Sequence, residues 1–574
     1  MVNLCLFLHF LLNYDIQIHL NQFSHYMHQP NFIILMTDQQ RSLQHFPEDW
    51  VRENLPNYSF FLDNSVKFTN HICNTSPCGP CRASLFSGMY PEKTGITGNF
   101  GTVSPEDMHF TKVLADAGYD IYYKGKLHMN EDFTSYSNTW PQDLATAPKM
   151  AQGEDEMIEK LYCIKGWTSP DFGTMLVQDN PTASELSNLA GGSGHNDNRV
   201  VTGEYRTYQT QESVLEFLER VQNGPPEKPF CLVVSLLNPH DVSLYPNGWQ
   251  QAGYQGALFE HFEEFELPES YYRDDLSEKP QVQAAYLNSE GGKLMGTSAL
   301  NYVKFYGYLH TLSDRLHGMV FDALGDELLD NTIVIRTADH GEMGMAHGGM
   351  IEKTYNAYEE TIKVPMMWYH KDFKPGERSE MISLIDLVPT LGSLAGADLK
   401  NYPALQGKDY SALLSPRGKA SGFGASLFNY GTLQPSTSTS RKGGGDSASK
   451  PFPSSSTEHN PNNVPYFAPS SVVPSDAQPS SYPDNIYAIL TDDGWKYAVY
   501  YSVSSDGTVD WSTAQYELYN LGRDPNELNN LLPVNGDASK AAKGRQTSLH
   551  AQLTALLNDN DITPAGWTPE TSTS

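Results

Sequence analysis

The sequence predicts an α/β protein in which a large, mostly parallel sheet lies between helices. Three apolar runs favour this fold: Asn31–Thr37, Pro229–Leu237 and Asn331–Thr337. Each run is short and continuous, which is typical of a parallel strand that is buried on both faces. Polar residues follow each run directly, and open α/β sheets bind ligands at the carboxyl ends of their strands. We therefore expect these polar residues to form one site.

Length and charge narrow the choice of function. The chain has 574 residues, which is enough for one large domain and a smaller one. Its formal charge of -30 at pH 7 argues against a nucleic acid partner or an anionic membrane surface, because the protein's field would repel both. An anionic substrate would need a locally positive pocket. Six cysteines are too few for a disulfide framework at this length.

Composition also predicts the domain boundaries. The first twelve residues are apolar but contain no Lys or Arg, so they resemble a signal only weakly and are too short to span a bilayer. Secretion and a cytoplasmic location both stay open. Residues 434–482 are dominated by Ser, Pro, Gly, Thr and Asn, which predicts a flexible insertion. The predicted parts are an N-terminal extension (1–27), a catalytic domain (28–415), the insertion (416–483), a C-terminal α+β subdomain (484–562) and a tail (563–574).

Several further elements are expected along the chain. Helical spacing predicts a helix over Phe110–Gly118, a short strand follows over Asp120–Tyr123, and an apolar helix over Ile382–Ala395 closes the large domain. In the C-terminal subdomain we expect antiparallel strands and a last helix. These lie at Ile486–Leu490, Trp495–Tyr501, Gln515–Asn520 and Ser548–Leu557.

Two of the strand ends carry candidate metal ligands. Asp38 and Gln39 follow the first apolar run, and Asp339 and His340 follow the last. This set is rich in oxygen and contains one imidazole, which suits a hard divalent cation.

The segment Thr75–Gly88 permits two interpretations. Cys78 and Cys81 form a Cys-x-x-Cys pair, which is typical of thiol–disulfide exchange. The same segment resembles the type I sulfatase signature, Cys-x-Pro-x-Arg followed by Leu-x-x-Gly. Three more stretches resemble that family: Gly125-Lys-Leu-His128, Asn238-Pro-His-Asp241, and the loop Glu342–Pro365 with Lys353. The exchange interpretation leaves these other stretches unexplained.

The resemblance covers roughly residues 30–415 and 484–560 and implies an alkaline-phosphatase-like fold. This fold is a mixed, mostly parallel sheet between helices, with a small C-terminal α+β subdomain that contains an antiparallel sheet. The resemblance further implies that a formylglycine-generating enzyme oxidises Cys78 to formylglycine, whose hydrated aldehyde attacks the sulfur of a sulfate monoester. The ester would be a small molecule or a carbohydrate.

Roles for the individual residues follow from the same resemblance. Arg82 would hold the hydrate, Lys126 and Lys353 would bind sulfate oxygens, His240 would protonate the leaving alcohol, and His128 would take a proton from the sulfated hydrate. One divalent metal ion is implied, with Ca²⁺ usual in the family and Mn²⁺ or Mg²⁺ open because of the imidazole. Its ligands would be Asp38, Gln39, Cys78, Asp339 and His340.

Other functions stay open at this point. The same site could hydrolyse phosphonate monoesters or phosphodiesters, since Gln39 and His340 resemble the variants found in that branch of the family. A Cys78–Cys81 disulfide would consume the precursor thiol, and an unconverted protein would be an inactive relative that binds sulfated ligands. A zinc site through Cys73, Cys78 and Cys81 has the wrong spacing. His347 could contact the substrate or belong to a loop.

Overall fold

The structure is a computed structural model. It describes residues 29–43, 45–99, 101–129, 147–167, 171, 193–204, 211–224, 226–250, 252–288, 294, 296–431 and 481–568. The N-terminal extension and most of the expected insertion lie outside these ranges. No helix within the described ranges is both long enough and apolar enough to cross a membrane.

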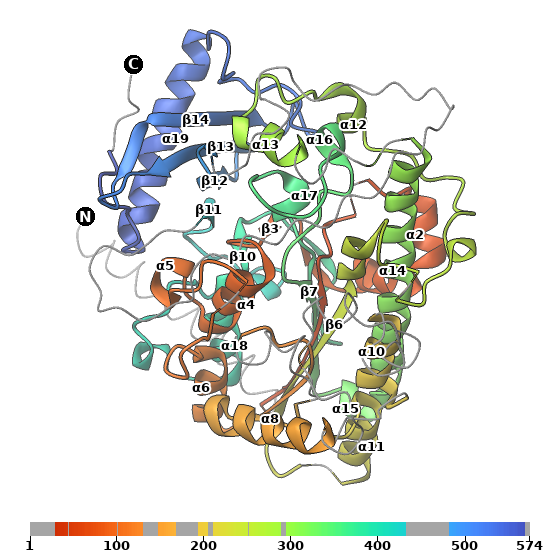
Figure 1. Ribbon diagram of the computed structural model, residues 1–574. Helices are drawn as coiled ribbons and strands as arrows, with labels where there is room; N and C mark the ends of the chain where they lie inside the picture. Colours follow the sequence, from red (N-terminus) through yellow and green to blue (C-terminus); the bar gives the residue numbers. More distant parts are fainter. Residues whose placement is uncertain are drawn as a thin grey trace, which may run out of the picture.

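An eight-stranded mixed sheet forms the centre of the large domain (Figure 1). Its strands run in the order β5 (Ile164–Lys165), β4 (Asp120–Gly125), β6 (Phe230–Pro239), β1 (Asn31–Asp38), β7 (Thr332–Ala338), β8 (Met366–Tyr369), β2 (Val66–Phe68) and β9 (Gly376–Arg378). From β5 to β7 all neighbours are parallel, and β8 is antiparallel to both β7 and β2. The predicted mostly parallel sheet is therefore confirmed, and the three apolar runs are its central strands β6, β1 and β7.

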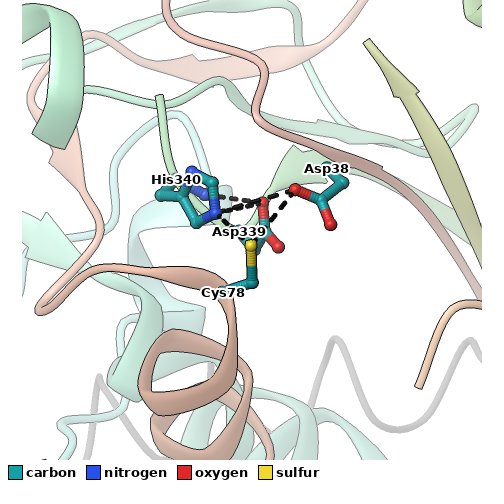
Figure 2. A group of neighbouring side chains, drawn as sticks. All are labelled: Asp38, Cys78, Asp339 and His340. Carbon is teal, nitrogen blue, oxygen red and sulfur yellow. Dashed lines mark hydrogen bonds and ion pairs between the residues drawn. The ribbon is translucent and has the colours of Figure 1, made fainter. Parts of the chain in front are cut away.

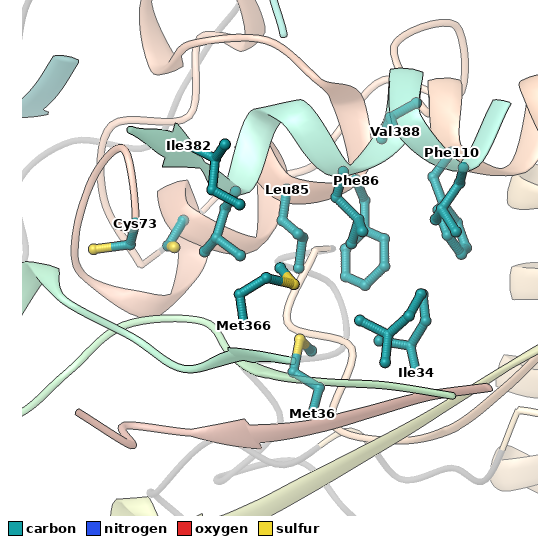
Figure 3. Packing of buried hydrophobic residues seen from close by; sticks show 14 of the residues in the cluster. Ile34, Met36, Cys73, Leu85, Phe86, Phe110, Met366, Ile382 and Val388 are labelled. Atoms are coloured by element: carbon teal, nitrogen blue, oxygen red, sulfur yellow. The ribbon is translucent and has the colours of Figure 1, made fainter. Parts of the chain in front are cut away.

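Alternate residues of β1 face opposite layers of the core, because successive side chains of a strand point to opposite faces. Ile34 and Met36 belong to one hydrophobic cluster, which includes Leu85, Phe86 and Phe110 (Figure 3). The helices on that face are α4 (Cys78–Ser87), α6 (His109–Asp116) and α18 (Leu387–Ala395). Ile33 and Leu35 belong to a second cluster. The helices on that side are α10 (Ser193–Thr202), α11 (Val214–Asn223) and α14 (Thr297–Asp322) (Figure 1).

The helix that closes the large domain is shorter than the sequence predicts. Of the expected span Ile382–Ala395, Ile382–Ser383 is a strand, β10, which pairs with β3 (His71–Ile72). A 3-10 turn over Leu384–Asp386 follows, and the α-helix begins at Leu387. The backbone N–H of Ser383 donates to the Asp386 carboxylate (2.8 Å), a contact that is typical of a helix start. The strand and the capped turn occupy the first five residues of the apolar pattern, so the helix begins only after them.

A four-stranded antiparallel sheet forms the C-terminal subdomain (Figure 1). It contains β11 (Ala425–Tyr430), β12 (Asn485–Thr491), β13 (Trp495–Val503) and β14 (Val509–Asn520), and α19 (Lys540–Asp559) packs against it. The three expected strands are confirmed. The edge strand β11 corrects the boundary at residue 416, because it lies within the range assigned to the insertion. Leu427 packs in the core of the subdomain and Phe428 in that of the large domain, so this short strand joins the two.

Two other C-terminal expectations need extension. The last helix begins at Lys540, well before Ser548, and Ser539 caps it by accepting from the N–H of Ala542. Trp567, in the expected tail, stacks on His550 of this helix and thus packs against the subdomain. The remaining helices are α2 (Glu48–Asn54), α3 (Pro56–Asn64), α5 (Pro91–Thr94), α8 (Ala147–Tyr162), α12 (Glu269–Arg273), α13 (Gln281–Tyr286), α15 (Gly325–Leu329), α16 (Ala346–Gly349) and α17 (Glu359–Ile362). Short 3-10 helices lie at His240–Leu244, Gly256–Leu258, Leu399–Asn401 and Ser411–Leu414.

Candidate active site

Four side chains from three segments converge beyond the carboxyl end of the central strands (Figure 2). Asp38 ends β1, Asp339 and His340 follow β7, and Cys78 begins α4. The ligand atoms of these four residues all lie within 4.8 Å of one another, and all four side chains are buried. We name this set the ligand cluster.

The chemistry of the ligand cluster fits a divalent cation. Cys78 Sγ lies 3.0 Å from His340 Nε2, and His340 Nε2 lies 3.6 Å from Asp38 Oδ1 and 3.7 Å from Asp339 Oδ1. Nδ1 of His340 is 3.0 Å from the carbonyl oxygen of Gly341 and must donate to it, which leaves Nε2 to face the cluster. Two carboxylates and one imidazole nitrogen form an oxygen-rich set that a cation would stabilise.

Gln39 lies beside the ligand cluster in a left-handed backbone conformation, with φ 66°. Its backbone N–H donates to Asp339 Oδ1 (3.0 Å). Its side-chain Nε2 donates to Glu342 Oε2 (2.5 Å), and its Oε1 accepts from Lys353 Nζ (2.5 Å). The side-chain amide of Gln39, the expected metal ligand outside the ligand cluster, is thus held between the Glu342 carboxylate and the Lys353 ammonium group.

Arg82 lies one helical turn after Cys78 and is fully buried. Its Nε donates to Asp339 Oδ2 (2.8 Å) and its Nη2 to Asp38 Oδ2 (3.4 Å). Nη1 donates to the carbonyl oxygen of Lys126 (2.7 Å) and to Ser235 Oγ (3.0 Å). The guanidinium group therefore compensates two buried carboxylates and joins α4 to four strands, β1, β4, β6 and β7. The family resemblance implied instead that Arg82 holds the hydrate at residue 78.

Lys126 and His128 follow β4, where the resemblance placed them. The ammonium group of Lys126 forms an ion pair with Asp38. Nε2 of His128 is 3.0 Å from the carbonyl oxygen of Asn99 and donates to it, while Nδ1 has no hydrogen-bond partner in the described part of the chain. The backbone N–H groups of Leu127 and His128 both donate to the Asp171 carboxylate (2.9 and 2.7 Å). Asp171 thereby fixes this loop.

His240 follows β6 directly and is 6% exposed. A second carboxylate, that of Asp197, accepts from the N–H groups of Leu237 and Asn238 (2.8 and 2.9 Å) and fixes the end of β6. Burial raises the pKa of Asp197 to about 8. Sequence reasoning missed both Asp171 and Asp197, since each lies outside any recognisable motif.

Lys353 lies on the loop after β7. Its ammonium group lies between Gln39 Oε1 and Glu352 Oε2, at 2.5 and 2.7 Å. Lys353 is nearly buried, whereas the Glu352 side chain is 25% exposed. Glu352 has φ 65°, a conformation that costs a residue with a side chain about 1 kcal/mol. Sequence reasoning did not assign Glu352 to the site.

Cationic side chains lower the pKa values of two members of the ligand cluster, Cys78 and Asp38. Burial opposes ionisation of the Cys78 thiol, but the positive charges of Lys126, Lys353 and His340 outweigh it and hold the thiol pKa well below its usual range. Burial and Cys78 would raise the pKa of Asp38, yet Lys126, His240 and Arg82 lower it to about 2.

The other candidate thiols and His347 have separate partners. Cys81 Sγ donates to the carbonyl oxygen of Asp339 (2.8 Å), and Cys73 Sγ lies 3.7 Å from that of Thr361. The described cysteines form no disulfide, so Cys78 and Cys81 are not bonded to each other. His347 stacks on Tyr358, with 3.6 Å between the ring centroids, and pairs with Asp274 (2.7 Å), which makes it part of a buried loop network.

Sequence comparison identifies relatives of this chain. The sulfatase family model matches residues 30–397. The uncharacterized sulfatase YidJ of Escherichia coli is 27% identical over 397 residues, which cover 68% of this chain and 72% of that protein. The ulvan-active sulfatase of Formosa agariphila is 26% identical, over 67% of this chain and 65% of that protein. The chain thus spans slightly less than two thirds of the latter relative.

Solved structures share the fold. BT4656, solved in complex with its substrate D-glucosamine-2-N,6-O-disulfate, is 17% identical and superposes with a TM-score of 0.59, over 93% of this chain and 98% of that one. The phosphonate monoester hydrolase SpPMH of Silicibacter pomeroyi is 18% identical with the same TM-score, over 93% of this chain and 96% of that one. The family match covers more than half of the chain, and it agrees with the fold and with the ligand cluster. The chain therefore belongs to the sulfatase family of sulfuric ester hydrolases.

Proposed function

We propose that this protein hydrolyses a sulfate monoester to an alcohol and inorganic sulfate. The observation that carries the proposal is the position of Cys78 at the start of α4, where its sulfur lies within 4.8 Å of the ligand atoms of Asp38, Asp339 and His340. A nucleophile at residue 78 could therefore attack an anion that is also bound by a metal ion in the ligand cluster. The sulfated sugar bound by BT4656 supports a carbohydrate ester as one substrate class.

Two groups would complete the site. Formylglycine, if formed from Cys78 by a formylglycine-generating enzyme, would supply a hydrated aldehyde as nucleophile, and a bound divalent ion would polarise a sulfuryl oxygen. Asp38, Gln39, Asp339 and His340 would hold the ion together with residue 78. Ca²⁺ is the first candidate from the family, and Mn²⁺ and Mg²⁺ also suit the donor set.

The remaining residues would bind the ester and move protons. Lys126 and Lys353 present ammonium groups beside the ligand cluster, where they would bind sulfate oxygens and stabilise the charge that develops on them. Nδ1 of His240 and Nδ1 of His128 have no hydrogen-bond partner within the described residues. We assign His240 to protonate the leaving alcohol and His128 to accept the proton released at residue 78.

An assay of inorganic sulfate release from an aryl sulfate tests this proposal. The protein would be coexpressed with a formylglycine-generating enzyme and loaded with Ca²⁺, and Cys78→Ala would serve as the control. We expect turnover by the first protein and none by the second. Absence of turnover despite an aldehyde at residue 78, established by mass spectrometry, would favour a binding function for sulfated ligands.

A phosphonate monoester or phosphodiester hydrolase is the second candidate. The similarity in fold to SpPMH favours it, because phosphorus and sulfur esters both present a tetrahedral anion to the same groups. The measurement that separates the two is kcat/KM for an aryl sulfate, an aryl phosphonate monoester and an aryl phosphate diester. Preference for a phosphorus ester would mean that the same site residues serve the hydrolysis of phosphorus esters.

A further inference from the structure

Glu342 is buried, contacts Gln39 and lies two residues after His340 in the sequence. Its side chain is fully buried, and four donors converge on its carboxylate. The hydroxyl of Tyr302 (2.7 Å) and the backbone N–H groups of Gly344 (3.0 Å) and Glu352 (2.9 Å) donate to Oε1. The side-chain Nε2 of Gln39 donates to Oε2 (2.5 Å). Glu342 is thus the acceptor in all four contacts.

These contacts decide how the Gln39 amide is oriented. A carboxylate accepts hydrogen bonds, whereas a lysine ammonium group can only donate them. Glu342 therefore binds the NH₂ group of Gln39, and Lys353 binds its oxygen, each at 2.5 Å. The reverse orientation would place the NH₂ group against the ammonium group and the oxygen against the carboxylate. The amide oxygen is also the only atom of this side chain that can bind a hard cation.

Helix α14 holds the backbone and the side chain of Gln39 through two tyrosines one turn apart. Tyr302 anchors the Glu342 carboxylate, as above. The hydroxyl of Tyr306 donates to the carbonyl oxygen of Gln39 (2.6 Å) and accepts from the N–H of Arg41 (3.2 Å). Since Gln39 has φ 66°, its backbone needs such support to keep a left-handed conformation.

We propose that Glu342 is a positioning residue: by binding the NH₂ group of Gln39 it keeps the amide oxygen, which here accepts from Lys353, as the end that can bind a metal ion. The chain Tyr302–Glu342–Gln39 thereby sets ion affinity. The inference rests on the proposed function in one respect, that Gln39 is a metal ligand. Outer partners of metal ligands commonly change affinity by about 10- to 100-fold when they are replaced. Glu342 has the contacts of such a partner, because it binds the side chain of an expected ligand and is not itself a member of the ligand cluster.

Calorimetric titration of the ion-free, full-length protein with Mn²⁺ and with Ca²⁺ tests the inference without any need for turnover. Glu342→Gln keeps the size of the side chain but replaces one acceptor oxygen with an NH₂ group, which cannot accept a hydrogen bond. We therefore expect the dissociation constant of the ion to rise about 10- to 100-fold. The matched control is Glu517→Gln in β14. Glu517 is also buried and accepts from Tyr500 (2.6 Å), Tyr519 (2.7 Å) and Gln283 (3.3 Å), but it belongs to the C-terminal sheet. We expect unchanged ion affinity in this control, even where its Tm falls.

Further variants separate the inference about Glu342 from the assignment of Gln39 as a ligand, on which it rests. Gln39→Ala should weaken ion binding, and an unchanged dissociation constant would overturn the assignment of Gln39 itself. If Gln39→Ala weakens binding and Glu342→Gln does not, the inference about Glu342 is wrong. The double variant Gln39→Glu with Glu342→Gln exchanges donor and acceptor and should regain affinity relative to Glu342→Gln alone. If Glu342→Gln does not fold, Tyr302→Phe provides the test, with a few-fold weaker binding expected and equal binding contradicting the inference.

Discussion

The sulfur of Cys78 lies 3.0 Å from Nε2 of His340 and 3.7 Å from Oδ1 of Asp38. The residue that the sulfatase signature marks for oxidation is therefore already within the ligand cluster as an unmodified cysteine. With Asp339, this arrangement offers one sulfur, one nitrogen and two carboxylates, and such a set suits a softer cation than calcium.

Unconverted protein should consequently bind Cd²⁺ or Zn²⁺ more tightly than Ca²⁺. The thiolate prefers soft ions, and a thiol pKa held below its usual range favours the thiolate form. Titration with Cd²⁺ should produce a sulfur-to-metal absorption band that Cys78→Ser abolishes. Cys163→Ser is the control, because that thiol is exposed and outside the cluster. Equal affinity for Cd²⁺ and Ca²⁺, or a band that survives Cys78→Ser, would contradict this prediction.

Replacement of Arg82 should destabilise the ion-free protein strongly. Arg82→Ala removes the partner of two buried carboxylates, Asp38 and Asp339, which typically costs about 3–5 kcal/mol. Urea unfolding measures the loss, and a saturating divalent ion should restore part of it by supplying positive charge. Arg52→Ala is the matched control, since the Arg52–Asp63 pair is exposed and worth about 1 kcal/mol or less. Similar losses in the two variants would show that Arg82 does not have this role.

The stability of the loop after β7 should depend on the charge of His347. Burial lowers its pKa, but Asp274 and Glu360 outweigh burial and raise the pKa to about 9, from 6.5 in the unfolded chain. The charged imidazole therefore stabilises the fold fully below about pH 6.5, and this contribution disappears as the pH rises through about 9.

The free energy of unfolding of the wild type and of His347→Gln, measured across this window, tests the prediction. The difference between the two proteins should shrink by on the order of 3 kcal/mol between about pH 6.5 and about pH 9.5. The Lys67–Glu377 pair, which is more exposed, provides the control variant Glu377→Gln. A constant difference between wild type and His347→Gln would exclude His347 as the titrating group.

Glu352 should weaken the binding of dianions. Its partly exposed carboxylate lies 2.7 Å from the ammonium group of Lys353, so it reduces the positive charge available to an anion. Glu352→Gln should therefore bind inorganic sulfate about tenfold more tightly, as measured by product inhibition or calorimetry. Unchanged or weaker binding would show that the carboxylate does not face the bound anion.

The sequence predicted the ligand cluster because its members directly follow apolar strands or begin a helix with a recognisable signature. Asp38 ends β1 and Asp339 follows the adjacent parallel strand β7, and the pairing of Thr37 with Ala338 places the two carboxylates together. The contributions of Glu342, Asp171 and Asp197 could not be predicted in this way. Asp171 and Asp197 accept hydrogen bonds from residues distant in sequence, and Glu342 accepts from the distant residues Gln39 and Tyr302. These bonds depend on how helices and loops pack around the strand ends.

Local pattern also failed at two places in the fold. The apolar pattern from Ile382 to Ala395 is compatible with a helix throughout. Its first five residues instead form the strand that pairs with β3 and the 3-10 turn that the Ser383–Asp386 contact caps. The strand β11 lies next to a Ser/Pro-rich stretch whose composition masked it, and its pairing with β12 is what orders it. Tertiary partners decided both outcomes.

The most direct test of the proposed sulfatase activity compares the rate of sulfate release with the fraction of chains that carry an aldehyde at residue 78. Preparations with different levels of formylglycine-generating enzyme provide a series, mass spectrometry gives the aldehyde fraction, and each preparation is assayed on an aryl sulfate with saturating Ca²⁺. We predict that kcat rises in proportion to that fraction and extrapolates to zero without the aldehyde. A rate that is independent of the aldehyde fraction would contradict a mechanism through residue 78.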